Sequence, residues 1–230
     1  MYKVLLWDID GTLLNFKEAE FYSLQNCFHK YHLGELTREL CQVYAQINDR
    51  YWQKLERNEI AKKDLLVERF KEFFTSMHYD FNDYVNFNHD YQLGLGDHIF
   101  FNDDSYSLIL DLKPHFKQYA VTNGTYTAQS KKLVKSHLNE ALDGAFISDL
   151  LKVEKPNHAF FEKVLDTVGS ANKQDYLIIG DSLTSDIQGG NNIGIDTCFY
   201  DPSGNIDTAD YNVKYHIHDL NELRQILEID

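Results

Sequence analysis

The chain has 230 residues, enough for one well-buried core and a smaller second domain, and it contains 43% hydrophobic and 25% charged residues, as globular proteins do. Asp and Glu outnumber Lys and Arg by 36 to 22, so the formal net charge is −14. A field of this sign repels nucleic acid polymers and anionic membranes, and it argues against a broad basic binding face. An anionic small molecule would need local help from a metal ion or a lysine.

The cysteines and the N-terminal segment bear on where the protein works. Cys27, Cys41 and Cys198 share no short spacing typical of a zinc site or a disulfide framework, so we interpret them as reduced packing residues. The apolar run at the N-terminus is soon interrupted by Asp8 and Asp10, which is not the pattern of a signal peptide, and no apolar stretch approaches membrane-spanning length. We therefore expect a cytoplasmic protein.

The first apolar run, residues 4–7, predicts a buried strand. From residue 16 to residue 96 the chain changes character, because it carries long helical patterns rich in aromatic and charged residues, at residues 18–31, 38–57 and 62–77. This stretch predicts an inserted α-helical cap domain at residues 16–96, with residues 1–15 and 97–230 forming the core domain. The two linkers, near residues 14–16 and 93–97, are candidates for hinges.

After the insertion, strands and helices are expected to alternate. Apolar runs that end in polar or glycine-containing turns predict strands at residues 119–121, 145–147 and 176–179, and helical patterns follow at residues 127–138, 157–168 and 185–191. Further strands at residues 195–200 and 213–217 and a helix at residues 220–227 complete an α/β fold with a doubly wound parallel sheet. Ligands of such sheets bind at the carboxyl ends of the strands, where the polar turns are expected.

The most specific motif is DIDGTLL, residues 8–14, directly after the first strand. Asp8 and Asp10 fall where Gly11 allows the chain to turn, so both carboxylates can face one pocket. A divalent cation would neutralise one carboxylate and leave the other free to exchange protons, which suits phosphoryl transfer through a nucleophile and a general acid/base. The alternative is a strand-end turn whose Asp side chains cap nearby amides.

A second candidate site is the turn formed by Thr122, Asn123 and Gly124, which follows a predicted strand and precedes a predicted helix. A hydroxyl and free main-chain N–H groups at such a place predict an anion cradle. Taken alone, a turn of this composition is more often a helix cap.

Lys155 is the candidate cation. Pro156 suits the first turn of the predicted helix at residues 157–168 and restricts the residue before it, so Lys155 has a defined direction and is able to point inward. An ammonium group there would keep Asp8 ionised and bind a phosphate oxygen. Lys152 is the competing candidate, and a solvated surface lysine is the alternative interpretation.

Asp181 and Asp186 bracket the turn after the strand at residues 176–179. Hard carboxylate oxygens at a strand end are the ligands that Mg²⁺ prefers when it also keeps waters and a phosphate oxygen. Asp181 is the better candidate, because Asp186 is equally well explained as a dipole or cap partner in the first turn of a helix.

In this order and at these strand ends, the four motifs resemble those of the haloacid-dehalogenase superfamily: DIDGTLL, VTNG at residues 121–124, EKPN at residues 154–157 and GDSLTSD at residues 180–186. The similarity in layout covers nearly the whole chain, and the inserted helices resemble the superfamily's α-helical cap of the first type. The resemblance implies phosphatase chemistry with Mg²⁺, since a true dehalogenase lacks the second acidic residue, here Asp10, and needs no metal.

The resemblance also implies a role for each matching residue. Asp8 would be the nucleophile and Asp10 the general acid/base, while Thr122 and Lys155 would bind phosphate beside Asn123 and Gly124. The residues implied for Mg²⁺ are Asp8, Asp10 through its main-chain carbonyl, Asp181, and Asp186 as support of the metal shell.

A looser resemblance concerns the cap. Residues 47–48, 51–52, 59–60 and 69–70 are similar to the YjjG-like branch of pyrimidine nucleotidases, which act on nucleoside monophosphates. The same aromatic residues and Arg69 are equally able to pack the cap core. Where that branch can carry Glu after the second Asp, this chain has Gly11.

We therefore expect a Mg²⁺-dependent phosphomonoester hydrolase that forms an aspartyl-phosphate on small phosphorylated metabolites such as nucleoside 5′-monophosphates. Its partners would be that metabolite alone, with no nucleic acid polymer and no membrane, in a monomer or homodimer. A phosphosugar phosphatase or mutase on the same scaffold is the nearer alternative. A phospho-accepting signalling module is the more distant one, because receiver domains are shorter and lack such an insertion.

Overall fold

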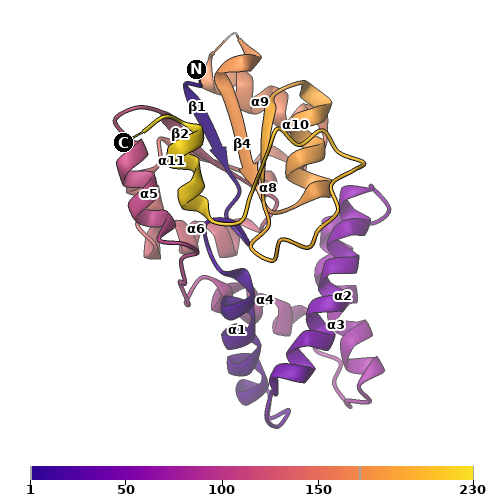
Figure 1. Ribbon diagram of the computed structural model, residues 1–230. Helices are drawn as coiled ribbons and strands as arrows, with labels where there is room; N and C mark the ends of the chain where they lie inside the picture. The colour runs from indigo at the N-terminus through magenta and orange to yellow at the C-terminus, as the bar shows by residue number, and fades with distance from the viewer. Residues whose placement is uncertain (1, 171, 230) are drawn as a thin grey trace. The chain divides into compact units, whose positions relative to one another are not determined.

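The computed structural model describes residues 2–170 and 172–229, and within them one parallel sheet of six strands forms the centre of the core (Figure 1). The strand order is β3-β2-β1-β4-β5-β6, and every neighbouring pair is parallel. The strands are β1 Val4–Trp7, β2 Lys117–Thr122, β3 Gly144–Ile147, β4 Tyr176–Gly180, β5 Asp196–Tyr200 and β6 Tyr215–Ile217. The predicted α/β fold with a doubly wound parallel sheet is confirmed.

The central strand β1 is buried on both faces, as the unbroken apolar run VLLW predicts for a parallel strand. Its alternate residues belong to different clusters: Leu5 and Trp7 pack with the residues of α5 Ser105–Leu112, and Leu6 packs with those of α9 His158–Val168. Two hydrophobic layers therefore hold the sheet, one on each face.

The remaining helices of this part are short. They are α6 Tyr126–Lys135, α7 Leu138–Ala141, α8 Ser148–Leu151, the 3₁₀ turn η1 Lys173–Asp175, the π-helical turn η2 Leu183–Ile187, α10 Gln188–Ile193, the 3₁₀ turn η3 Leu220–Glu222 and α11 Leu223–Ile226. Among the described helices, none combines the length and apolarity that crossing a membrane would require.

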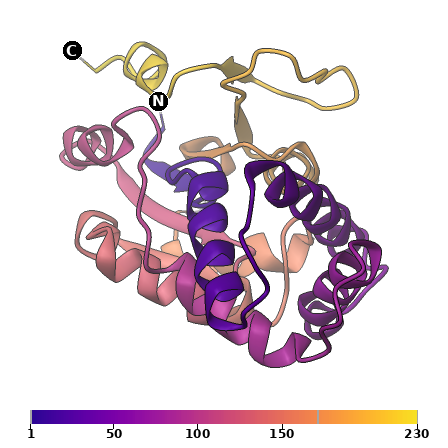
Figure 2. The same cartoon turned by 90° about the horizontal axis from the view of Figure 1, so that it is seen from below.

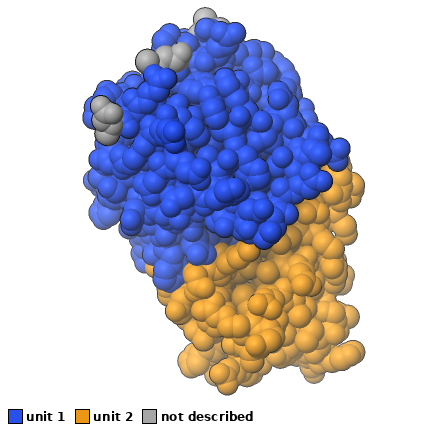
Figure 3. Space-filling view, in the orientation of Figure 1, with its two compact units in different colours: residues 1–16, 99–230 blue, residues 17–98 orange. Residues whose placement is uncertain are grey.

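The chain divides into two compact units, residues 1–16 with 99–230 and residues 17–98 (Figure 3). The second unit contains the helices α2 Arg38–Glu56, α3 Lys62–Ser76 and α4 Tyr84–Leu95, together with α1 Phe16–Lys30 apart from its first residue. Figure 2 shows α2 and α3 side by side. Aromatic side chains form its interior, with Phe28, Phe70, Phe73, Phe74 and Phe87 each 1% exposed or less.

Candidate active site

The turn after β1 carries Asp8 and Asp10. The main-chain N–H of Asp8 donates to the carbonyl of Ile179 at 2.9 Å, so this residue continues the parallel pairing of β1 with β4, and its side chain is buried. Asn102 holds the turn, because its Nδ2 donates to the carbonyl oxygens of Gly11 and Thr12 at 3.1 and 3.0 Å. Asp8, the candidate nucleophile, therefore lies in a turn that hydrogen bonds to β4 and to Asn102 hold in place.

Lys155 lies between α8 and α9 and is 1% exposed. Its Nζ donates to Oδ1 of Asp8 at 2.7 Å, to Oδ1 of Asp186 at 2.6 Å and to the carbonyl of Val121 at 2.7 Å. An ammonium group has three donors, so these acceptors satisfy it, and a phosphate oxygen would have to replace one of them. Burial alone would lower the pKa of Lys155, but the charges of Asp186 and Asp8 raise it above its usual value, and the group stays cationic.

The end of β4 brings two more carboxylates to the same place. Oδ1 of Asp181 accepts a hydrogen bond from Oγ1 of Thr12 at 3.0 Å. Asp186 lies in the π-helical turn η2, where its Oδ2 accepts from the main-chain N–H of Ser182 at 3.2 Å. Its other oxygen pairs with Lys155, so Asp186 both caps the turn and belongs to the charged cluster. One oxygen each of Asp8, Asp181 and Asp186 lies within 4.8 Å of the others.

The charges of this cluster fit a divalent cation. When ionised, Asp8, Asp181 and Asp186 carry three negative charges against one positive charge on Lys155, an excess of two. Burial, reinforced by the neighbouring carboxylates and opposed by the lysine, raises the pKa of Asp8 well above its usual range. Partial burial and the charge of Asp186 raise the pKa of Asp181 to about 7. Hard oxygen donors with this excess charge are a suitable set for Mg²⁺.

Gly11 makes the close approach of the two loops possible. Its φ of +99° is unfavourable for a residue with a Cβ, and a Cβ built there would lie 2.2 Å from Oδ2 of Asp181. Any side chain would therefore displace a candidate metal ligand.

Asp10 faces a different set of partners, which the sequence reasoning missed. Its Oδ1 pairs with Nζ of Lys132, and its Oδ2 accepts from Nε2 of Gln129 at 2.6 Å. Lys132 is 1% exposed and also lies over the ring of Phe16, with 5.2 Å between Nζ and the ring centroid. Gln129 and Lys132 are three residues apart on α6 and share a face of that helix. This spacing, in the helix that follows the Thr122 turn, was the sequence signal that could have indicated partners for Asp10.

The turn at residues 122–124 binds its own neighbours. Oγ1 of Thr122 accepts from the N–H of Gly124 at 3.0 Å, so that N–H is not free, contrary to expectation. The side chain of Asn123 donates from Nδ2 to the carbonyl of Lys155 at 2.9 Å and accepts from its N–H at 2.8 Å. The helix cap belongs to Thr125, whose Oγ1 accepts from Ala128. Asn123 therefore fixes the main chain of Lys155, and phosphate binding by this turn stays a prediction.

The structure excludes Lys152 as the lysine of the cluster and corrects the predicted position of Pro156. Lys152 is exposed and ends α8 with φ of 58°, so it is not part of the cluster. The placement of Pro156 in the first helical turn is wrong, because α9 begins at His158 and its N-cap is Asn157, whose side chain accepts from Ala159. The proline lies before the cap, and its peptide bond with Lys155 is cis.

Arg69 lies inside the second unit and is 1% exposed. Its guanidinium donates to Oδ1 of Asn48 at 2.6 Å and to Oδ1 of Asn88 at 2.8 Å, and it lies 4.9 and 5.1 Å from the ring centroids of Phe70 and Tyr91. These contacts favour the packing interpretation of Arg69.

A parallel sheet with carboxylates and a lysine converging at the carboxyl ends of β1, β2 and β4 has the architecture of the hydrolases that the motifs resemble. Comparison with known families agrees, because residues 5–200 match the family described as haloacid dehalogenase-like hydrolase, and the chain belongs to this family. It is a hydrolase of the YjjG-like branch.

Three relatives place the chain within the family. HAD-hydrolase YfnB of Bacillus subtilis is 31% identical over 100% of this chain and 97% of its own, and its crystal structure bound to magnesium superimposes with a TM-score of 0.92 over 99% of both chains. Pyrimidine 5′-nucleotidase PynA of Streptococcus pneumoniae is 32% identical over 99% of this chain and 95% of its own. Pyrimidine 5′-nucleotidase YjjG of Escherichia coli is 26% identical over 97% and 96%.

Proposed function

We propose that this protein is a Mg²⁺-dependent phosphomonoesterase that works through an aspartyl-phosphate on Asp8. The observation that carries the proposal is the convergence of three carboxylates, Asp8, Asp181 and Asp186, two of which pair with Lys155, while Asp10 is held separately by Lys132 and Gln129. Two carboxylates from one turn thus have different partners, and Mg²⁺ beside Asp8 would offset the burial that raises the pKa of this residue, as a nucleophile requires.

In the first step a carboxylate oxygen of Asp8 attacks phosphorus, the bond to the leaving oxygen breaks, and protonated Asp10 gives its proton to that oxygen. In the second step a water molecule attacks the same phosphorus and loses a proton to Asp10, which releases phosphate and restores the Asp8 carboxylate. Lys155 and Thr122 would contact phosphate oxygens. When bound by Asp8, Asp181, the carbonyl of Asp10 and, in support, Asp186, Mg²⁺ would supply the charge that offsets carboxylates and phosphate.

Nucleoside 5′-monophosphates of pyrimidines are the proposed substrates. The support is that two relatives aligned over nearly their whole length, PynA and YjjG, are pyrimidine 5′-nucleotidases. We further propose that residues 17–98 are the cap domain of this enzyme.

The test of substrate class is a screen of nucleoside monophosphates, sugar phosphates and p-nitrophenyl phosphate with and without Mg²⁺. We expect pyrimidine monophosphates to lead and activity to disappear with a chelator. Sugar phosphates in the lead would refute the nucleotidase assignment, and a need for added sugar bisphosphate would indicate a mutase.

The test of the nucleophile is Asp8→Asn, with Asp166→Asn as control, since Asp166 is an exposed carboxylate on α9. Asp8→Asn should lose at least about 10³-fold in turnover while staying folded, and the control should keep its rate. Quenched wild-type enzyme given ³²P-labelled substrate should carry a label that hydroxylamine removes. Near-normal turnover by Asp8→Asn would exclude this role.

A further inference from the structure

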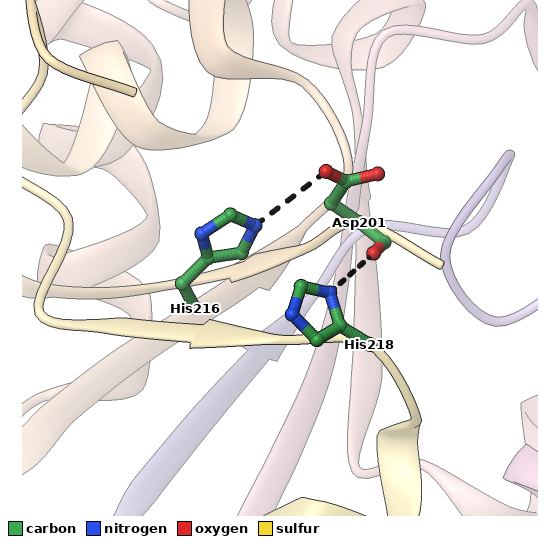
Figure 4. Close-up of side chains that lie close together, drawn as sticks. All are labelled: Asp201, His216 and His218. Carbon is green, nitrogen blue, oxygen red and sulfur yellow. Dashed lines mark hydrogen bonds and ion pairs between the residues drawn. The ribbon is translucent and has the colours of Figure 1, made fainter. Parts of the chain in front are cut away.

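A second cluster of metal-binding side chains lies at the sheet edge, apart from the carboxylates described above. Asp201 directly follows β5, and His216 and His218 belong to β6 and the residue after it (Figure 4). One oxygen of Asp201 and one ring nitrogen of each histidine lie within 4.8 Å of one another. We propose that these three residues bind a transition-metal cation of the Zn²⁺ type.

Strand geometry explains why the three side chains meet. His216 and His218 are two residues apart, so they point to the same face of the sheet. The register pairs Phe199 with His216 and Tyr200 with Ile217, and the N–H of Asp201 donates to the carbonyl of Ile217 at 2.9 Å, which extends the pairing by one residue. Asp201 therefore stands beside the two imidazoles, whose ring centroids are 5.0 Å apart.

Hydrogen bonds hold the Asp201 carboxylate in place. Oδ1 accepts from the N–H and the hydroxyl of Ser203 at 3.0 and 2.6 Å, and Oδ2 accepts from the N–H of Ile206 at 3.0 Å. These donors fix the direction of the carboxylate toward the two imidazoles. Nε2 of His216 lies 3.6 Å from this oxygen, close to the ~3.3 Å that separates neighbouring ligands of a tetrahedral zinc ion.

The backbone also orients His218. Its Nδ1 lies 2.7 Å from the carbonyl oxygen of Asp201, which is the main-chain contact that fixes the tautomer of metal-binding histidines (Figure 4). With the proton on Nδ1, Nε2 keeps its lone pair for a metal, and because Nε2 lies on the side of the ring away from Asp201 (Figure 4), the side chain has to turn to bring it to the cation. Both imidazoles are exposed, while the carboxylate of Asp201 is 1% exposed. The histidine side chains therefore have room to move toward a cation bound at the fixed Asp201 oxygen.

Two nitrogen ligands and one carboxylate oxygen select against Mg²⁺, which prefers oxygen alone, and suit Zn²⁺ with a water in the fourth position. A bound cation would tie the edge strand β6 to the end of β5 and so stabilise the residues 202–214 that connect them.

The experiment is a calorimetric titration of the full chain with ZnCl₂ in saturating Mg²⁺, which keeps the carboxylate cluster occupied. The variants are His216→Asn and His218→Asn, because Asn keeps a donor near the position of Nδ1 and removes Nε2. The control is His137→Asn, since His137 also lies near a carboxylate, with 3.5 Å between its Nδ1 and Oε1 of Glu140, and has φ of 58°, which Asn tolerates.

We expect wild type and His137→Asn to bind one Zn²⁺ with the same affinity, and each of the other variants to bind at least about tenfold more weakly. A crystal grown with Zn²⁺ should show an anomalous peak beside Oδ2 of Asp201. The proposal is overturned by no binding to wild type under saturating Mg²⁺, by equal binding to all variants, or by a peak elsewhere.

Discussion

Nζ of Lys155 lies 2.7 Å from Oδ1 of Asp8, and both side chains are buried. The lysine is the cation within a group of three carboxylates, and it also pairs with Asp186 at 2.6 Å. Removing it would leave buried negative charges without compensation.

Lys155→Met should therefore reduce both stability and activity. We expect a loss of about 3–5 kcal/mol in the free energy of unfolding, because a broken buried ion pair strands its partner. Turnover should fall at least about 10³-fold through the lost positioning of Asp8 and the lost phosphate contact. Denaturant unfolding and phosphatase assays measure these effects. Lys152→Met is the control, because Lys152 is exposed, and an equal loss in that variant would contradict the assignment.

Comparison of Gly11→Ala with Gly169→Ala separates the effect of a collision with Asp181 from the effect of backbone strain. Its Cβ would lie 2.2 Å from Oδ2 of Asp181, whereas a Cβ at Gly169, which has φ of +80° in the same unit, would meet nothing within 4 Å. Gly169→Ala should lose about 1–2 kcal/mol of stability through its left-handed backbone conformation, and Gly11→Ala should lose more, because the collision adds to the same strain. Only Gly11→Ala should also need much more Mg²⁺ for activity. Equal Mg²⁺ dependence in the two variants would show that Gly11 does not protect the ligand.

The pair formed by Lys132 and Asp10 leads to a prediction about proton transfer. Lys132→Met should lower turnover by about 10–100-fold, because Asp10 loses one of the two partners that fix its carboxylate. The loss should be smaller for p-nitrophenyl phosphate, whose leaving group needs little protonation. Lys135→Met, an exposed change on the same helix, should have no effect. Equal losses on alkyl and nitrophenyl substrates would argue that Lys132 acts on binding instead.

Much of the core was predictable because its signals are local. The run VLLW before Asp8 is apolar at each position, as a strand covered on both faces must be, and three of the four motifs lie at the end of a strand. The acidic residues could be expected at one edge because parallel strands place their carboxyl ends together. The helix α4 was missed, since its sequence YVNFNHDYQLGL mixes aromatic, amide and glycine residues without a clear apolar face.

The missed partners of the site depend on contacts across the chain. Asn102 holds the turn at residues 11–12 although it lies 91 and 90 residues from Gly11 and Thr12 in sequence. Asn123 is at a position where a phosphate contact was expected, yet its amide bonds both main-chain groups of Lys155. Neither contact leaves a periodic or motif-like trace, so only the folded structure shows them.

Arg69 and Arg50 offer a matched test of the packing interpretation. Arg69 is buried among Asn48, Asn88 and aromatic rings, while Arg50 forms an exposed ion pair with Glu72. Arg69→Met should cost about 3 kcal/mol or more, because the buried amide oxygen of Asn48 and the half-buried one of Asn88 lose charge-assisted hydrogen bonds, and Arg50→Met should cost less than about 1 kcal/mol. Thermal and denaturant unfolding followed by far-UV circular dichroism compare them. If Arg69 instead contacted substrate, its variant would raise KM without loss of stability.

The three cysteines should be nearly inert in the native protein. Burial raises the pKa of the Cys27 and Cys41 thiols to about 12 and that of the Cys198 thiol well above its usual range. Because the thiolate is the nucleophile, only about one thiol in 10⁴ is ionised at pH 8 for a pKa near 12. Alkylation by iodoacetamide should accordingly be at least about 100-fold slower in native than in denatured protein. Its rate should keep rising about tenfold per pH unit up to the limit of folding, whereas the denatured chain should level off above about pH 9. A native rate that also levels off near pH 9 would reveal an exposed thiol.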